Sequence, residues 1–336
     1  MQPDKSYSRA QRFLRCPYSY DLYYNRGIRA VVKAAPLKMG SLVDAGLCAL
    51  ILNESPEAGR IALHAAAQES MDQMCAFVIE CPDLWDTPIG LDEYSAQLSE
   101  DTEKAWELVL RGAEYLGFPT EHDGPSDTWE TAVVDGVPAV QLKLVTEGIL
   151  SYLDWVAIEK ATGRSWLFEF KVRKSLTSEI DDDFDGQKLV YLAQLRARGF
   201  EPSGTRVLEI RNELPKAPKV NKNGSISRAA CATTWEIYKS MIIQHGGNPD
   251  DYEVMREKLE AREWVRDIYN FRAETEMMEG LANVHKVDAL AKSTEVYPRN
   301  MSKWSCKGCD VRDYCWSEMR GHDADALIGS TFHKRK

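Results

Sequence analysis

Apolar and polar positions alternate most densely in the middle of the chain. Aromatic and β-branched residues recur through residues 150–158 and again through residues 165–172, so each run predicts a β-strand. Gly163 lies in the short turn between the two runs, which predicts that they form a hairpin. Because successive side chains of a strand point to opposite faces, Glu169 and Lys171 are expected on one face of it.

The same alternation predicts a sheet around this hairpin. Residues 129–144 begin the sheet, with Asp135-Gly136 as a hairpin turn, and residues 204–214 add a further strand. Apolar positions elsewhere follow helical spacing. The predicted helices cover residues 8–14, 38–52, 55–116, 187–198 and 235–290. Strands combined with this many helices indicate the α/β class.

The order of these elements predicts one domain built from five segments, and 336 residues are enough for it. Helices occupy residues 1–54, a helical insertion follows at residues 55–127, and the sheet-bearing core falls within residues 128–215. A basic loop and further helices form residues 216–300, and residues 301–336 hold a cysteine cluster and a tail.

Composition places the chain among ordinary globular proteins, with 44% hydrophobic and 28% charged residues. No stretch approaches the roughly 18 apolar residues that a membrane span needs, so no membrane partner is expected. The first residues lack the apolar centre of a signal peptide. These features predict a cytoplasmic protein, in which thiols stay reduced and clustered cysteines favour metal binding over disulfides.

The predicted hairpin carries the residues with the clearest chemistry. Asp154, Glu169 and Lys171 combine two carboxylates with a lysine, a set able to hold a divalent metal ion and orient water against a phosphate. The alternative without chemistry is that Asp154 caps a turn while Glu169 and Lys171 form an exposed pair on one face of the strand. The net charge of −10 counts against a nucleic-acid partner, but a local cleft can differ from the total, to which catalytic carboxylates themselves contribute.

Three further groups of charged residues lie outside the hairpin. Asp44 lies within the helix predicted at residues 38–52, either on its solvent face or as a ligand. Residues 178–186 are acidic and predict a solvated loop. Residues 216–228 are basic and predict a flexible loop, which either meets a phosphate backbone or is a solvated linker with no partner.

Three cysteines with aromatic residues between them lie close together near the end of the sequence: Cys306, Cys309 and Cys315. This spacing lets one short segment present several thiolates to a metal. A fourth ligand is available nearby from His322 or His333, or at a distance from Cys16. Zinc and iron–sulfur clusters both take such ligands, and the spacing does not separate them.

Together, these residues resemble the motifs of one nuclease family. Asp154, the Glu169-Phe170-Lys171 triplet and the pair Gln187 and Tyr191, one helical turn apart, look like the motifs of the RecB-like branch of the PD-(D/E)XK nucleases. Cys16 near the start, with the three late cysteines, resembles the iron–sulfur clamp of that branch. It occurs in CRISPR-adaptation exonucleases, in the AddB nuclease domain and in phage relatives. The resemblance runs from Tyr7 to Trp316.

The resemblance implies a restriction-endonuclease-like core, a mixed sheet flanked by helices, with helical insertions and a [4Fe-4S] staple that joins the two chain ends. The implied cluster ligands are Cys16, Cys306, Cys309 and Cys315. The implied ligands of Mg²⁺ or Mn²⁺ are Asp154, Glu169 and the carbonyl of Phe170. Lys171 would orient or help deprotonate the attacking water, while Gln187 and Tyr191 would touch DNA or support the site.

One departure from the family pattern concerns Asp44, which stands where the branch carries a histidine. Aspartate can ligate Mg²⁺, which prefers oxygen, so Asp44 is expected as a further metal ligand with a preference shifted toward Mg²⁺. The same departure allows a second interpretation, a catalytically weakened protein that binds DNA ends or a partner. A zinc-stapled endonuclease is a third.

The resemblance implies a DNA exonuclease acting at single-stranded or duplex ends in recombination, repair or DNA processing. The sequence has no Gly-x-x-x-x-Gly-Lys-Ser/Thr loop, so a helicase or recombination partner would be another chain.

Overall fold

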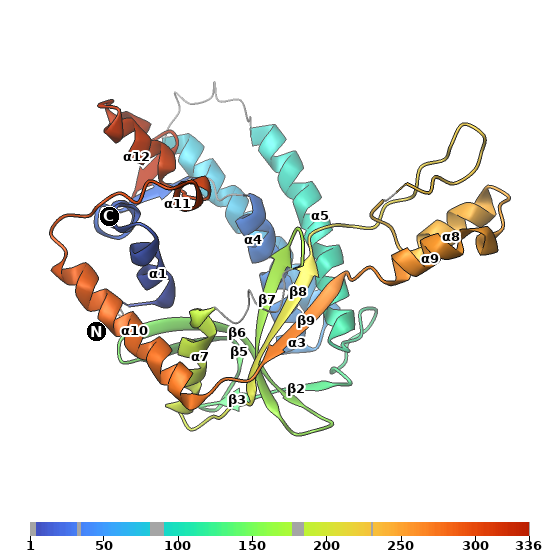
Figure 1. The fold of residues 1–336 in the computed structure, drawn as a ribbon, viewed down its shortest axis with the longest axis horizontal. Coiled ribbons are helices and arrows are strands. Elements are labelled where there is room, and N and C mark those ends of the chain that lie inside the picture. Colours follow the sequence, from blue (N-terminus) through green and yellow to red (C-terminus); the bar gives the residue numbers. More distant parts are fainter. Residues whose placement is uncertain (1–4, 32–34, 81–90, 177–184, 230, 336) are drawn as a thin grey trace.

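A mixed β-sheet organises the computed structural model of this chain, which describes residues 5–31, 35–80, 91–176, 185–229 and 231–335 (Figure 1). Six of the described strands form this sheet, in the order β2-β6-β7-β8-β9, with β5 paired to β6. The strands are β2 (Trp129–Thr131), β5 (Val140–Thr146), β6 (Ile149–Glu159), β7 (Ser165–Arg173), β8 (Gly204–Arg211) and β9 (Val265–Asn270). Helices cover both faces, so the predicted α/β architecture is confirmed.

The central hairpin forms as the alternation predicts. β6 and β7 pair antiparallel with Trp155 opposite Phe168, and Gly163 takes a φ of 70° in the turn between them. β7 and β8 then run parallel, which requires the crossover helix α7 (Gly186–Arg196). The predicted turn at Asp135-Gly136 joins the short strands β3 (Val133–Val134) and β4 (Val137–Pro138), and both turn residues have positive φ, as a type I′ turn needs.

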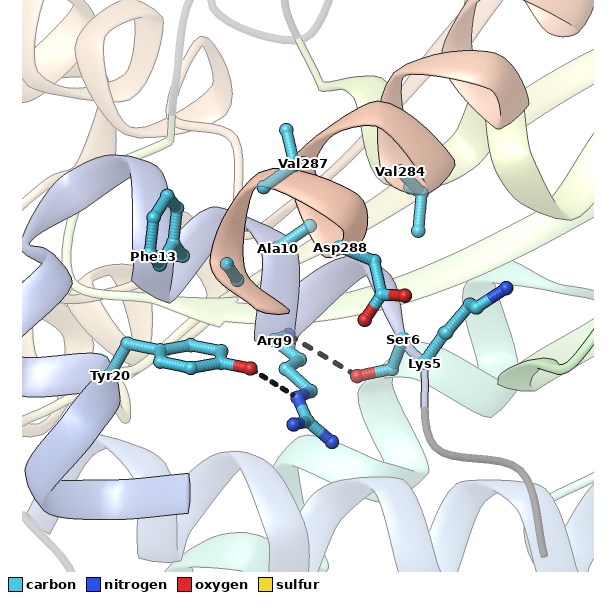
Figure 2. Close-up of a pocket in the computed structure, with 10 residues that line it drawn as sticks. Lys5, Ser6, Arg9, Ala10, Phe13, Tyr20, Val284, Val287 and Asp288 are labelled. Atoms are coloured by element: carbon cyan, nitrogen blue, oxygen red, sulfur yellow. Dashed lines mark hydrogen bonds between the residues drawn. The ribbon is translucent and has the colours of Figure 1, made fainter. Parts of the chain in front are cut away.

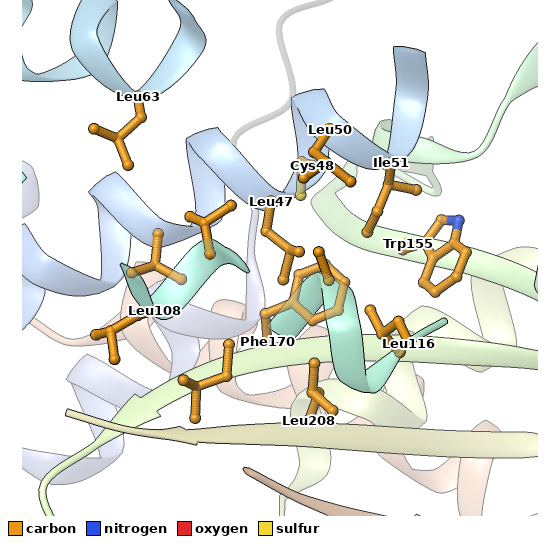
Figure 3. Packing of buried hydrophobic residues seen from close by; sticks show 14 of the residues in the cluster. Leu47, Cys48, Leu50, Ile51, Leu63, Leu108, Leu116, Trp155, Phe170 and Leu208 are labelled. Atoms are coloured by element: carbon orange, nitrogen blue, oxygen red, sulfur yellow. The ribbon is translucent and has the colours of Figure 1, made fainter. Parts of the chain in front are cut away.

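One face of the sheet packs against α3 (Ala35–Asn53), α4 (Pro56–Glu80) and α5 (Leu91–Tyr115). Figure 3 shows this layer, in which Leu47 and Leu108 from the helices meet Trp155 and Phe170 from the sheet. The rings of Trp155 and Phe168 lie 4.8 Å apart between their centroids, and Trp129 meets Phe168 edge-on at 4.9 Å. Buried aromatic pairs of this kind hold the central strands against the helices.

The other face packs against α1 (Tyr7–Arg15), α7 and α10 (Glu274–Ser293). Figure 2 shows a small pocket between α1 and α10, where Ala10 and Val287 contribute apolar walls. Arg9 donates a hydrogen bond of 2.9 Å from its Nε to the Tyr20 hydroxyl there. α1 begins two residues earlier than Ser8 suggests, because Ser6 accepts the N–H of Arg9 and caps the helix.

The two ends of the chain pack against each other. They contribute α2 (Pro17–Tyr20), the π-turn η1 (Asp21–Asn25), β1 (Ile28–Ala30), α11 (Lys303–Lys307), α12 (Arg312–Met319), η4 (Ala324–Leu327) and β10 (Phe332–Lys334). β1 pairs antiparallel with β10, and a small core that includes Leu22, Tyr314 and Phe332 lies beneath them. The guanidinium of Arg12 forms a bidentate ion pair with Asp310, with Nη1–Oδ1 at 2.9 Å and Nη2–Oδ2 at 2.8 Å.

The segment predicted as helical at residues 235–290 is partly wrong. It contains α8 (Trp235–Gln244), the 3-10 turn η3 (Pro249–Tyr252) and α9 (Glu253–Glu260), but then β9 before α10. β9 is an edge strand in which only Ile268 is buried, so its sequence shows little alternation. Backbone pairing with β8 defines it instead. Residues 216–228 form no regular helix or strand, as predicted for a loop, and a single bridge from Val220 to Ile226 gives them the shape of a hairpin.

Within the described parts of the chain, no helix has both the length and the apolar character that crossing a bilayer requires.

The packing of Trp155 yields a stability prediction. Trp155→Ala removes a fully buried indole and should lower the free energy of unfolding by about 3–5 kcal/mol. Tyr152 lies on the same strand but is 51% exposed, so Tyr152→Ala should change it by less than about 0.5 kcal/mol. Denaturant unfolding of both variants measures the difference. Equal losses would show that the layer beneath β6 does not depend on this ring.

Candidate active site

At Asp154 the alternation of side chains along β6 is interrupted, so the residues before and after it pack on opposite faces of the sheet. Val140 and Trp155 pack toward α3, whereas Leu142 and Leu153 pack toward α7. The register pairs Val140 with Trp155 and Leu142 with Leu153, which leaves Gln141, at a φ of 49°, opposite Asp154. A local irregularity of this kind re-aims side chains. Asp154 is therefore accessible to groups from both layers of helices.

Asp44 approaches Asp154 from α3. Its carboxylate accepts a hydrogen bond of 2.8 Å from Nε2 of Gln141 and one of 3.4 Å from the thiol of Cys48. The Cys48 thiol also lies 3.8 Å from the backbone oxygen of Asp154. Asp44 is half-buried and faces the sheet, so the interpretation of a solvent-facing acid is wrong.

Glu169 and Lys171 approach from the neighbouring strand and lie on one face of it, as predicted. The ammonium of Lys171 forms an ion pair with Oε1 of Glu169. Glu169 is only 6% exposed, and its other oxygen, Oε2, is buried with no hydrogen-bond partner among the residues that the structure describes. The N–H of Phe170 donates to Asp154 at 2.8 Å, which ties the two strands together at the site, while the Phe170 ring packs into the core.

The first turn of α7 completes the cluster. The amide of Gln187 donates to the hydroxyl of Tyr191, so this predicted pair shares a helix face. Asp185 caps α7 by accepting the N–H of Gln187 at 3.0 Å. The solvated loop predicted at residues 178–186 is wrong for Asp185, which is partly buried near Glu169, and residues 177–184 lie outside the described residues.

Burial and mutual repulsion dominate the electrostatics of these carboxylates. Loss of water contact, followed by the nearby charges of Asp44 and Glu169, raises the pKa of Asp154 well above its usual range. Burial also raises the pKa of Asp44, although hydrogen bonds from Cys48 and Gln141 oppose the change. Ionising acidic groups this close together is unfavourable in free energy, and a bound cation would offset that repulsion.

The lysines of the site respond in opposite directions. Burial lowers the pKa of Lys171, but the adjacent Glu169 outweighs that effect and the net pKa is raised. Lys188, on α7, is almost fully buried, and burial lowers its pKa to about 8. Lys171 therefore stays positively charged at neutral pH beside the carboxylates.

The donor set fits Mg²⁺ or Mn²⁺ in chemistry, since carboxylate oxygens are the ligands both ions take. The partnerless Oε2 of Glu169 is a buried acceptor of this kind. Within the described residues, however, no three His, Cys, Asp or Glu side chains are already arranged around a common metal position. Gln141, Cys48, the Phe170 amide and Lys171 engage four of the carboxylate oxygens, namely both of Asp44 and one each of Asp154 and Glu169.

The four predicted cluster cysteines line one pocket: Cys16, Cys306, Cys309 and Cys315. Burial raises the pKa of the Cys315 thiol, Arg299 lowers it, and the nearby Cys16 and Cys309 raise it further. His322 and His333, the alternative fourth ligands, do not line this pocket. The four thiols are partly buried and form no disulfide among the described residues, and thiolates are soft ligands.

Sequence reasoning missed three contributors to the site. Gln141 carries no motif, and only its strand register reveals it. Cys48 has no metal-like partner spacing, and the available signal was its place one helical turn after Asp44, which puts both on one face of α3. Asp185 belongs to an acidic run, which gave it no distinct motif. Its position just before α7, where it caps the helix, was the available signal for it.

The model of the PD-(D/E)XK nuclease superfamily matches residues 5–316. The chain therefore belongs to this superfamily, whose members usually use Mg²⁺ or Mn²⁺. A comparison with curated proteins found no match.

The raised pKa of Asp154 predicts a pH-dependent gain from neutralising it. At pH 7 in metal-free buffer, Asp154→Asn should unfold at a higher temperature than wild type, since the variant avoids a buried charge. The gain should vanish near pH ~4, the ordinary aspartate range, where Asp154 is protonated in the folded and, increasingly, the unfolded chain.

Thermal unfolding across this pH range measures the effect, with the exposed Asp123→Asn as control. A gain that persists unchanged at low pH would point to packing rather than charge.

Proposed function

We propose that this chain is a metal-dependent DNA exonuclease that hydrolyses phosphodiester bonds at DNA ends. The observation that supports it most directly is the meeting of Asp44, Asp154, Glu169 and Lys171 at one position, with a buried acceptor of Glu169 left without a partner. Repelling carboxylates beside a lysine are costly unless they bind something positive.

Asp154, Glu169 and Asp44 would hold Mg²⁺ or Mn²⁺, with the carbonyl of Phe170 as a further ligand. When bound, the ion supplies Lewis acidity and neutralises charge on the scissile phosphate. Lys171 keeps its proton, because Glu169 raises its pKa. Its role is therefore to orient water and stabilise negative charge on the phosphate rather than to take a proton.

Gln187 and Tyr191 would support this site from α7. Burial raises the pKa of Tyr191 and keeps its phenol neutral. The phenol can then donate a hydrogen bond toward the DNA while it accepts one from Gln187. Exonuclease action rests on the resemblance to end-processing relatives, which also places the activity in recombination, repair or DNA processing, with any unwinding motor on another chain.

The experiment is digestion of end-labelled linear DNA and closed circular DNA with Mg²⁺ or Mn²⁺. Wild type should degrade linear DNA alone, and Glu169→Ala or Lys171→Ala should lower the rate by at least about 100-fold, as loss of a group acting at the transition state does. Mn²⁺ should also raise the thermal midpoint of wild type but not of Glu169→Ala.

Glu121→Ala, an exposed change, serves as control and should behave as wild type. Cutting of circular DNA would instead establish an endonuclease, and unchanged rates in both site variants would overturn the proposed catalytic residues.

A [4Fe-4S] cluster on Cys16, Cys306, Cys309 and Cys315 is the second part of the proposal. The supporting observation is that all four thiols line one pocket although one of them is far away in sequence. Thiolates are the ligands of such clusters. The cluster would reinforce chain ends that β1 and β10 already pair.

Anaerobically purified wild type should be brown and contain iron and acid-labile sulfide. Cys306→Ser and Cys315→Ser should lose most of both, whereas Cys231→Ser, outside the pocket, should retain them. A colourless protein that contains zinc would contradict the cluster and favour the zinc-stapled alternative.

One observation favours a second function, a weakened nuclease-fold protein that binds DNA ends. Asp44 replaces the family histidine, and Gln141 and Cys48 already engage its carboxylate. Tight DNA binding without hydrolysis would support this function. Asp44→His would then be the variant expected to gain activity.

A further inference from the structure

The segment between β8 and β9 forms a module of its own, which we call the arm (residues 212–264). β8 and β9 are antiparallel neighbours, and a short turn would suffice to join them. The chain instead inserts a hairpin, α8 and α9, which project away from the sheet in Figure 1. The arm has a separate apolar core, built around Tyr238, Ile242 and Leu259.

The arm leaves the sheet at the same end as the candidate active site. β8 runs parallel to the catalytic strand β7, with Lys171 in register with Glu209 and Arg173 with Arg211. The N–H of Asn212, the first residue of the arm, donates to the carbonyl of Arg173 at 2.7 Å. The root of the arm thus follows β8 and lies beside the carboxyl end of β7, the strand that carries Glu169 and Lys171.

Contacts with α5 hold this root in place. Lys104 and Arg111 donate hydrogen bonds of 3.1 Å to the carbonyls of Asn212 and Glu213. Trp264 lies between two guanidinium groups, those of Arg111 and Arg262, each 4.9 Å from its ring centroid. Such contacts fix the direction in which the arm projects.

The hairpin of the arm is strongly basic in an acidic protein. Between Glu213 and Glu236 the sequence contains four basic residues and no acidic ones, although the chain as a whole carries a charge of −10. Arg228 is committed to the fold, since it donates to the carbonyl of Asp251 at 2.7 Å. Lys219 and Lys222 are exposed near the tip, and neither forms an ion pair within the described residues.

Contacts within the hairpin and with the core of the arm support its conformation. The bridge between Val220 and Ile226 closes it, and the N–H of Ser227 donates to the carbonyl of Lys219 at 2.8 Å. The Tyr238 hydroxyl in turn donates to the carbonyl of Ser227 at 2.9 Å, so the hairpin is joined to the core of the arm. Its lysines are therefore presented on a supported structure.

We propose that the basic hairpin binds the phosphate backbone of DNA that extends beyond the active site. The proposal rests on the proposed nuclease function and adds a second contact to it. Lysine ammonium groups on a projecting hairpin can contact phosphates whatever the base sequence. Each such contact releases counterions from the DNA. The arm would increase affinity for DNA and leave the chemical step to the residues of the sheet.

The test is a binding titration of labelled DNA in EDTA, which prevents hydrolysis. Lys219→Ala/Lys222→Ala should weaken binding roughly three- to tenfold at moderate salt and reduce the slope of log K against log[salt] by about 2, as expected for two lost phosphate contacts. With metal present, KM should rise while kcat stays unchanged.

The matched control is Lys239→Ala/Lys258→Ala, which removes the same charge from exposed positions on α8 and α9 of the same arm. An equal loss in this control would overturn the assignment to the hairpin, as would an unchanged salt slope in the hairpin variant. If the wild type binds DNA through the hairpin yet never cleaves it, the arm stands and the exonuclease function fails. If it cleaves DNA and the hairpin variant matches it, only the arm proposal fails.

Discussion

The placement of one partly buried carboxylate, that of Asp154, governs the rest of this structure. Its charge is disfavoured by burial and by two neighbouring acids, yet the amide of Phe170 holds it at the junction of β6 and β7. Only a rigid sheet, packed on both faces, can keep repelling groups together in the folded chain. Packing of the two apolar layers thus offsets the unfavourable free energy of the acidic cluster. Asp154 lies at the point where the side chains of β5 and β6 change from one layer to the other.

The strands of the core could be predicted because their pattern is local. The hairpin of β6 and β7, the turn at Asp135-Gly136 and the helix that carries Gln187 and Tyr191 all follow from spacing and turn chemistry. β9 could not, because an edge strand with one buried side chain is defined by its partner rather than by its own residues. For the site, motif residues were found by resemblance, whereas Gln141 owes its place to strand register, a property that spacing within its own segment does not reveal.

The cysteines illustrate how far such reasoning extends. Their spacing at the end of the sequence indicates a shared ligand, but it leaves the fourth member open. The fold brings Cys16 to the pocket of the other three through tertiary contacts between the two chain ends, among them the pairing of β1 with β10 and the ion pair of Arg12 with Asp310. The spacing of the late cysteines alone does not reveal these contacts.

The arm has a consequence for how such proteins can diverge. It is inserted between two strands that already pair, so its removal would leave their register intact, and its core shares no residue with the layers around the sheet. A module attached in this way can be lengthened, exchanged or lost without disturbing the carboxylates. The junction at Asn212 and Trp264 is therefore a natural grafting point, at which one catalytic core can acquire different means of holding its substrate.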